Sequence, residues 1–208
     1  GAAELEAGCA LAREYDVASV CILPFALARC ADLLAGSAVK PGTTVGFPHG
    51  GHATRVKAAE AEQALRDGGL ELDMVVNISK VVSGDWGYVR DDIRAVLEPT
   101  HGGGAKLKVI FENCYLSDAQ KIKLCEICGE ARADWVKTST GFGSGGATAE
   151  DIALMRAIVG DDVGVKASGG VRTTQDAQKM IEAGANRIGA SASVAIVTGL
   201  KAVAGGKY

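Results

Sequence analysis

Residues 163–190 of this chain read Val-Gly-Val-Lys-Ala-Ser-Gly-Gly-Val-Arg-Thr-Thr-Gln-Asp-Ala-Gln-Lys-Met-Ile-Glu-Ala-Gly-Ala-Asn-Arg-Ile-Gly-Ala. A short β-branched run opens this stretch, and a helical pattern then begins at Thr173 and stops at Gly184. A second short run follows at 187–190. Because a helix between two short apolar strands is typical of a parallel sheet, the stretch predicts a strand-helix-strand unit of the α/β class.

The same order of strand and helix recurs along the chain. One helical stretch covers Val56–Asp67 and is stopped by Gly68-Gly69, and another begins at Thr148 with a sequence that resembles a capping box. The strand candidates are the runs 18–23, 43–47, 72–77, 107–112, 135–138, 164–167 and 187–190. Because no linker interrupts these units, we expect one domain over residues 1–208.

Two parallel architectures fit this pattern, a closed barrel and an open doubly wound sheet. The glycine-rich phosphate turn that favours a dinucleotide-binding sheet is not found after the first run. Polar residues cluster instead at the C-terminal ends of several runs, where barrels place their functional sites. The sequence therefore predicts a TIM (β/α)8-type barrel.

The start of the chain departs from that fold, because it opens with a helix that places Leu5, Cys9 and Ala12 on one face. The first strand of an eight-stranded barrel is not recognisable and is apparently missing. Seven strands would leave ladder groups unpaired at an edge. We expect upstream residues, the N-terminal helix folded inward or a second subunit to cover it. We also expect lower stability than a full-length relative has, and self-association if no internal segment fills the gap.

Composition and charge limit the partners of the chain. A hydrophobic fraction of 48% supplies a core, and a net charge of −3 without a basic block argues against nucleic acid or anionic membrane as the main partner. No apolar stretch approaches the roughly 18 residues of a spanning helix, and no signal-peptide pattern is present. These features predict a soluble, cytoplasmic protein.

The six cysteines and the histidine pair do not predict a metal site. The cysteines lie within apolar patterns, and Cys125 and Cys128 have the spacing of half a zinc site without a second pair. His49 and His52 lie in a glycine loop with no carboxylate ligand near in sequence. We expect neither a metal nor an organic cofactor.

Two lysines stand at the C-terminal ends of short apolar runs. Lys137 lies in Asp134-Trp-Val-Lys-Thr-Ser-Thr-Gly-Phe-Gly, and Lys166 lies in Val163-Gly-Val-Lys-Ala-Ser-Gly-Gly-Val-Arg. A cation at the end of a buried strand is costly unless it is paired or its pKa is lowered. Two cations at one barrel mouth would disfavour each other's protonated form, which is how an enzyme obtains a nucleophilic amine near neutral pH.

Seven motifs together resemble those of the deoxyribose-phosphate aldolase family, class I (Schiff-base) aldolases on a TIM barrel. The resemblance runs from about Ala10 to Val197. The motifs are Val-Cys21-Ile-Leu-Pro24, Gly46-Phe-Pro48, Glu71-Leu-Asp73-Met-Val, Lys108-Val-Ile-Phe-Glu112, Val-Lys137-Thr-Ser-Thr-Gly-Phe-Gly, Val-Lys166-Ala-Ser-Gly-Gly-Val-Arg172 and Arg187-Ile-Gly-Ala-Ser191.

The resemblance implies a role for three side chains. Lys137 would be the Schiff-base lysine, Lys166 its electrostatic neighbour and proton relay, and Asp73 the carboxylate that moves protons with a water. The implied reaction is the reversible cleavage of 2-deoxy-D-ribose 5-phosphate to acetaldehyde and D-glyceraldehyde 3-phosphate. The residue chemistry agrees, because a protonated imine is an electron sink that needs no metal or organic cofactor. A structural salt bridge is the alternative role for Asp73.

The resemblance also implies a phosphate site built from small residues. Such residues let backbone N–H groups approach an anion, and the start of a following helix adds its dipole. The implied residues are Gly141, Gly169, Gly170, Gly189 and Ser191.

Three positions differ from the family pattern or extend it. Ala192 stands where some members have a second serine, which removes a hydroxyl from the phosphate site. No segment matches the Asp-x-Thr of the family's first strand, so we expect weaker positioning of Asp73. Tyr208 resembles a C-terminal tyrosine that closes over the site in some members, although an exposed terminus explains it equally well.

The sequence leaves rival functions open. An active aldolase would act on a small phosphorylated sugar and acetaldehyde, and it could form a homodimer. A catalytically impaired barrel acting as a binding or regulatory protein is the main alternative, and an unrelated Schiff-base lyase is a third. The presence of Lys137, Lys166 and Asp73 together favours the aldolase. Burying three charged side chains at one end of the barrel costs free energy, and a protein without catalytic activity has no evident reason to keep them.

Overall fold

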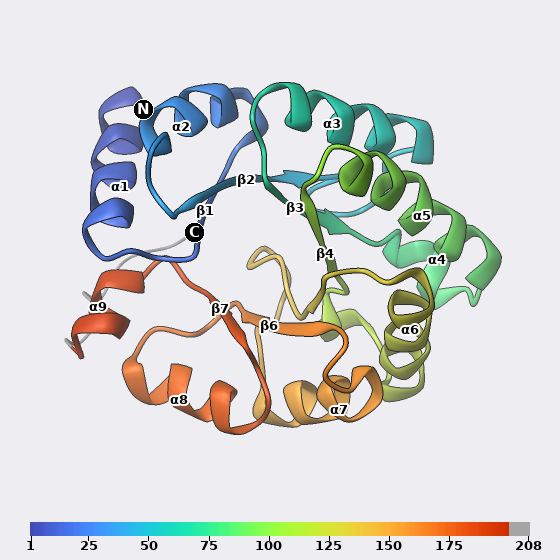
Figure 1. The fold of residues 1–208 in the computed structure, drawn as a ribbon. Coiled ribbons are helices and arrows are strands. Elements are labelled where there is room, and N and C mark those ends of the chain that lie inside the picture. The colour runs from blue at the N-terminus through green and yellow to red at the C-terminus, as the bar shows by residue number, and fades with distance from the viewer. Residues whose placement is uncertain (200–208) are drawn as a thin grey trace.

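The computed structural model describes residues 1–199, and it contains one curled parallel sheet with helices on its outer face (Figure 1). The strands are hydrogen-bonded in sequence order from β1 to β7. Their bounds are β1 Ser19–Ile22, β2 Lys40–Val45, β3 Glu71–Val75, β4 Lys106–Ile110, β5 Trp135–Lys137, β6 Gly164–Ser168 and β7 Arg187–Gly189. The predicted α/β barrel class is therefore confirmed, with seven strands in the described part of the chain.

The helices follow the strands in alternation and form the outer layer. Their bounds are α1 Ala2–Glu14, α2 Leu27–Leu34, α3 Thr54–Arg66, α4 Ile78–Val82, α5 Trp86–Gly102, α6 Asp118–Ala131, α7 Ala149–Val159, α8 Thr174–Glu182 and α9 Ser193–Thr198. None of those in the described residues is long and apolar enough to cross a lipid bilayer.

Local signals position several helix ends. Thr148 caps α7 by accepting a hydrogen bond from the Asp151 N–H, and Thr173 forms a capping box with Asp176 at the start of α8. Both starts agree with the prediction, and α3 begins two residues before the predicted Val56.

Alternation along each strand separates the apolar core from the polar interior of the barrel. Leu72 and Met74 of β3, like Leu107 and Val109 of β4, are fully buried in the main core cluster that the helices complete. The intervening residues point the other way, and on β3 these include Asp73. The curled sheet therefore directs the polar residues of adjacent strands toward one another.

A buried ion pair fixes α3 and α5 beneath the end of β3. Lys57 Nζ donates to Asp92 Oδ2 at 2.5 Å and to the Val75 carbonyl at 2.9 Å, and both charged side chains are fully buried. Gly46 has φ of 65°, and a Cβ there would lie 2.8 Å from Lys57 Cε. Glycine is therefore required where the chain leaves β2 and passes over this lysine.

The edges of the sheet are connected by side chains and not by a strand ladder. Within residues 1–199, β1 pairs only with β2 and β7 only with β6. Arg187 of β7 donates to the Ser19 hydroxyl of β1 at 3.3 Å, which bridges the two edges. Helix α1 packs on the outside of α2 and β1, so the N-terminal helix is not folded inward, which was one of the three expected covers.

Candidate active site

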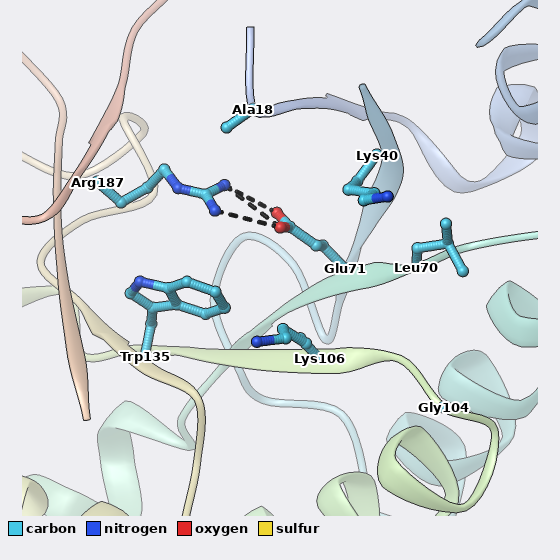
Figure 2. Close-up of a pocket in the computed structure, with 8 residues that line it drawn as sticks. All are labelled: Ala18, Lys40, Leu70, Glu71, Gly104, Lys106, Trp135 and Arg187. Atoms are coloured by element: carbon cyan, nitrogen blue, oxygen red, sulfur yellow. Dashed lines mark hydrogen bonds and ion pairs between the residues drawn. The ribbon is translucent and has the colours of Figure 1, made fainter. Parts of the chain in front are cut away.

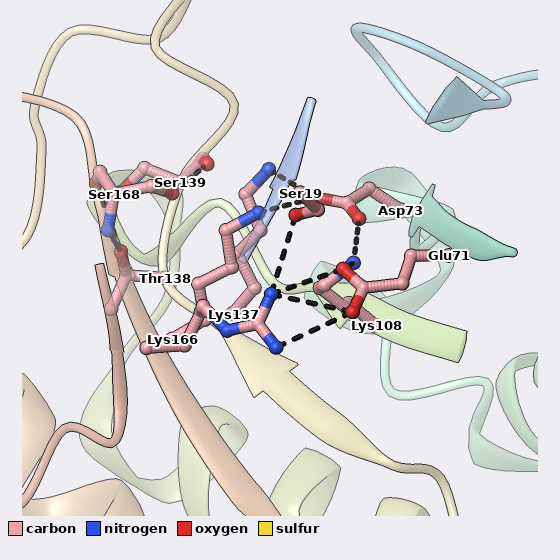
Figure 3. A network of polar contacts seen from close by, with 10 residues as sticks. Ser19, Glu71, Asp73, Lys108, Lys137, Thr138, Ser139, Lys166 and Ser168 are labelled. Carbon is pink, nitrogen blue, oxygen red and sulfur yellow. Dashed lines mark hydrogen bonds and ion pairs between the residues drawn. The ribbon is translucent and has the colours of Figure 1, made fainter. Parts of the chain in front are cut away.

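Four charged side chains from the central strands of the curled sheet meet on its inner side (Figure 3). Asp73 of β3 accepts hydrogen bonds from Lys137 Nζ of β5 at 2.7 Å and from Lys166 Nζ of β6 at 2.9 Å, both on Oδ2. Its Oδ1 accepts from Lys108 Nζ of β4 at 2.8 Å. Lys137 and Lys166 are register partners on the adjacent strands β5 and β6, which explains how two residues far apart in sequence place both amines on one oxygen.

Asp73 is ionised in this site and firmly held. Its burial alone would raise the pKa, but the ammonium groups of Lys137, Lys166 and Lys108 together hold the pKa of this carboxyl well below its usual value. The carboxylate is fully buried and accepts three charge-assisted hydrogen bonds. The weak positioning expected for Asp73 is therefore not observed. Its side chain makes salt bridges, as the alternative structural role would require, and it also lies at the centre of the candidate site.

Lys166 has the chemistry of an amine that changes protonation under ordinary assay conditions. Desolvation, aided by the positive charges of Lys137 and Lys108 and opposed by Asp73, lowers the pKa of Lys166 to about 8. A substantial fraction of this side chain is therefore neutral at pH 8, where a solvent-exposed lysine is almost wholly protonated. Such a group can both accept and release a proton near neutral pH.

Three charged residues of this cluster are not among the residues predicted from the sequence, namely Lys108, Glu71 and Arg187. Lys108 also donates to Glu71 Oε2 at 2.7 Å, and Glu71 pairs with Arg187 at 3.1 Å. Two signals could have found them. Lys108 interrupts an apolar strand as Lys137 does, and Glu71 stands two residues before Asp73, which places both on one face of the strand.

The loop after β6 has the backbone that close approach to an anion requires. Gly169 and Gly170 have φ of 83° and 80°. Within residues 1–199, the N–H groups of Gly170 and Val171 donate to no protein acceptor, so they are free for a ligand. The N–H groups of Arg172 and Thr173, at the start of α8, already donate to Asp176. The free donors of this loop therefore lie before the helix.

The loop after β5 lies against the glycine loop of β6. Gly146 leaves no room for a side chain, because a Cβ there would lie 2.3 Å from the Gly169 carbonyl oxygen. Gly141 has φ of 91°, and the preceding Thr140 donates its hydroxyl to the buried Glu112 and accepts from the Phe142 N–H. Gly141, Gly169 and Gly170 thus belong to two loops in mutual contact at the C-terminal ends of β5 and β6.

Gly189 ends β7 beside Lys166, and Ser191 follows two residues later. A Cβ on Gly189 would lie 2.9 Å from Lys166 Cε, so this glycine makes room for the lysine side chain. Ser191 is exposed, and the hydroxyl of the neighbouring Ser193 donates to the Ala190 carbonyl at 2.9 Å. The predicted site residues therefore lie on β3, β5, β6 and β7 or in the loops that follow these strands, with Asp73 and Lys166 in the middle of their strands.

The other candidate residues lie apart from this cluster. Cys125 and Cys128 are buried in α6, and burial raises the pKa of both thiols. Among residues 1–199, no group of three or more histidine, cysteine, aspartate or glutamate side chains is arranged to hold a metal ion. Tyr208 lies outside the described residues.

Comparison with known proteins connects this arrangement to one family. Residues 1–204 match the DeoC/LacD family of aldolases. The deoxyribose-phosphate aldolase of Rhodopirellula baltica is 60% identical over 91% of this chain and 78% of its own length, and that of Thermococcus kodakarensis is 51% identical over 92% and 86%.

Solved structures agree in fold. The aldolase QR15 superposes with a TM-score of 0.90 and 37% identity over 95% of this chain and 88% of its own. The tetrameric deoxyribose phosphate aldolase of Aeropyrum pernix has a TM-score of 0.86 and 29% identity over 93% and 82%. The curled parallel sheet, its helical outer layer and the sequence likeness over nearly the whole chain lead to one conclusion: the chain belongs to the DeoC/LacD aldolase family.

Proposed function

We propose that the chain is a deoxyribose-phosphate aldolase, an aldehyde-lyase that reversibly cleaves 2-deoxy-D-ribose 5-phosphate to acetaldehyde and D-glyceraldehyde 3-phosphate. The observation that carries this proposal is the pair of buried amines, Lys137 and Lys166, held on one oxygen of Asp73. Relatives that bear this name and are 60% and 51% identical to the chain support the choice of substrate.

In the proposed reaction, the neutral amine of Lys137 attacks the aldehyde carbon of the open-chain sugar. Loss of water from the resulting carbinolamine yields a protonated imine, which is the electron sink that carbon–carbon cleavage needs. The bond between C2 and C3 then breaks, its electron pair forms the enamine, and the C3 hydroxyl loses its proton as it becomes the aldehyde of glyceraldehyde 3-phosphate. Protonation of the enamine at C2 and hydrolysis of the imine release acetaldehyde and restore Lys137.

Lys166 and Asp73 suit the proton transfers of this cycle. Lys166, with its pKa lowered to about 8, can deliver and recover a proton at neutral pH. Asp73 has a pKa held well below the usual range, so its carboxylate is present at all working pH values. We assign it the role of a proton acceptor that acts with a water molecule and orients both amines.

We propose that the phosphate group binds at the loops after β5, β6 and β7. The free N–H groups of Gly170 and Val171 and the exposed Ser191 supply donors, and Gly141, Gly169 and Gly189 let the backbone approach the ligand. The alanine at position 192 supplies no hydroxyl there.

The direct test combines turnover with trapping of the imine. We expect the purified chain to release acetaldehyde from 2-deoxy-D-ribose 5-phosphate without added metal or organic cofactor. Borohydride reduction in the presence of acetaldehyde should add a two-carbon group, which mass spectrometry of peptides should place on Lys137. An adduct on Lys166 instead would exchange the two roles, for which the lowered pKa of Lys166 is an argument. A folded chain with neither turnover nor adduct would support the impaired, binding or regulatory barrel.

Replacing Lys166 with leucine should shift the pH dependence of the reaction. The substitution removes from beside Lys137 both a positive charge and an amine that exchanges a proton near neutral pH, so adduct formation should need a higher pH. The measurement is the rate of adduct formation and kcat/KM as functions of pH. Lys123→Leu, which removes a surface lysine from α6, is the matched control and should leave the profile unchanged. A normal profile and rate in Lys166→Leu would exclude this lysine from the mechanism.

Two further expectations stay predictions. A cytoplasmic location and a homodimer were expected from the sequence, and the subunit state can be measured by light scattering. The Arg187–Ser19 hydrogen bond joins β7 and β1 at the two edges of the sheet. A homodimer that formed through these edges would bury both side chains.

A further inference from the structure

The ionic cluster around Asp73 does not end at the catalytic lysines. From Asp73 Oδ1 it continues through Lys108 to Glu71, and Glu71 accepts from both terminal nitrogens of Arg187 at 3.1 to 3.3 Å. Lys108 and Glu71 are almost completely buried. The chain of contacts therefore runs through the barrel interior from the C-terminal toward the N-terminal ends of the strands.

The far end of this chain is held by residues from both edges of the sheet. Figure 2 shows Arg187 of β7 facing Glu71 of β3 across a pocket at the N-terminal ends of the strands. The Arg187 guanidinium lies 4.8 Å from the centre of the Trp135 ring, and Lys108 Nζ lies 5.7 Å from it. Trp135 thus supports both cations that bind Glu71, which fixes the carboxylate between them.

Charge balance suggests what this chain does. The cluster holds four cationic side chains, Lys108, Lys137, Lys166 and Arg187, but only two carboxylates. The carboxylates of Asp73 and Glu71 raise the pKa of Lys108 against the effect of burial, so it stays charged. The ammonium of Lys108 and the guanidinium of Arg187 lower the pKa of Glu71 in spite of its burial. Glu71 is thus the second anion of a cluster that is rich in cations.

We propose that Glu71 and Arg187 are positioning residues that hold Lys108 on Asp73 and thereby set the net charge that the two amines of the active site experience. Within residues 1–199, neither residue has a hydrogen bond or ion pair with Lys137 or Lys166, because Glu71 binds Lys108 and Arg187, and Arg187 binds Glu71 and Ser19. Removing the charge of Glu71 leaves the cluster with one more net positive charge. Removing the charge of Lys108 leaves it with one fewer. The two changes therefore have opposite electrostatic effects on Lys166.

Charged and titratable groups from several neighbouring strands surround Lys166. Cys21 on β1 lies near these charges, and desolvation together with the negative charge of Asp73 raises the pKa of its thiol, so it adds no charge at neutral pH. The other titratable or charged groups in the cluster are Glu71 and Asp73 on β3, Lys108 on β4, Lys137 on β5 and Arg187 on β7.

The experiment measures the protonation of Lys166 directly. Trace acetic anhydride acetylates only neutral amines, so the rate of labelling at each lysine, read by mass spectrometry across pH, has a midpoint at its pKa. Glu71→Gln should lower the midpoint of Lys166 by roughly one pH unit, and Lys108→Met should raise it by about the same amount. The double variant restores the original net charge, and its midpoint should return close to that of the unaltered protein.

Matched controls separate charge from structure. Lys106→Met removes an exposed lysine two residues away on the same strand, and it should leave the midpoint unchanged. Three results would overturn the proposal. The first is an equal shift of the Lys166 midpoint in Lys106→Met and Lys108→Met, and the second is a shift of the same sign in Glu71→Gln and Lys108→Met. The third is a double variant whose midpoint lies further from that of the unaltered protein than the midpoint of either single variant. If circular dichroism shows that a single variant is unfolded, the double variant tests the proposal. A Lys166 midpoint in the double variant that lies far from that of the unaltered protein would contradict charge compensation.

The inference rests on the proposed function only for its catalytic consequence. In the same variants, the pH at which the acetaldehyde adduct reaches half its maximal rate should move in the same direction as the Lys166 midpoint. If the unaltered protein forms no adduct, the proposed function fails while the acetylation midpoints still test the positioning role. If the adduct forms but neither midpoint moves, the positioning role alone is wrong.

Discussion

Replacing Lys137 with alanine should abolish the acetaldehyde adduct and reduce turnover of 2-deoxy-D-ribose 5-phosphate by at least about 10⁴-fold, the scale seen when a covalent nucleophile is removed. The protonated imine on this amine is the electron sink of the proposed reaction, and it cannot form once the amine is lost. The fold should persist, because Asp73 keeps two of its three ammonium partners, Lys108 and Lys166. Borohydride trapping, steady-state kinetics and thermal melting together measure these effects.

A surface lysine provides the control for this change. Lys123→Ala removes an amine from α6 that pairs with Glu126 and should affect neither adduct nor rate. Retention of the adduct in Lys137→Ala, mapped to Lys166, would mean that the neighbouring amine is the nucleophile. Loss of cooperative unfolding in the same variant would mean that Lys137 is needed mainly to neutralise Asp73.

Replacing Asp73 with asparagine should slow turnover by roughly 10²–10⁴-fold, the usual contribution of one general acid or base. The amide cannot accept a proton, and it no longer holds the two amines with a charge. The negative charge of Asp73 raises the pKa of Lys166 against the larger effect of desolvation. Removing this charge should lower that pKa from about 8, so Lys166 should lose its proton at a lower pH. The acid limb of the pH–rate profile should therefore move to lower pH, in the direction opposite to that of Lys166→Leu.

Stability must be measured beside rate for this variant, because the substitution leaves three buried cations with fewer anions. Asp118→Asn, which removes an exposed carboxylate from the start of α6, is the matched control and should change neither property. A variant of Asp73 that unfolds without a separable loss of rate would assign this carboxylate to structure alone.

The fold was predictable because its signals are local. Each short apolar run followed by a helical pattern can be read without knowing its neighbours, and the caps at Thr148 and Thr173 define two helix starts through contacts with residues three positions away. Strand ends were less accurate. Strand β2 begins at Lys40 and not at Thr43, because pairing with β1 extends it through Pro41. Such pairing is a property of two segments and has no signal in either one.

The site was predictable to the extent that its residues violate the local pattern. Lys137, Lys166 and Asp73 each place a charge in an apolar strand, where burial without a partner is costly, and this cost made them candidates before any contact was known. Lys108 also places a charge in an apolar strand, but its motif entered only through the resemblance to the family, so Lys108 was not among the predicted site residues.

The amino-acid order by itself determined the parallel α/β class, the strand-helix units and the two lysines whose motifs resemble those of an aldolase family. Only the tertiary structure decided that Asp73 is shared by three ammonium groups, that Glu71 and Arg187 extend this cluster to the other end of the barrel, and that α1 lies outside the sheet. The physical reason is that these are contacts between residues 35 to 116 positions apart, made only when adjacent strands fall into register and the sheet curls. Periodicity reports which face of its own strand a side chain occupies, whereas the register and curvature of the whole sheet decide which charges meet.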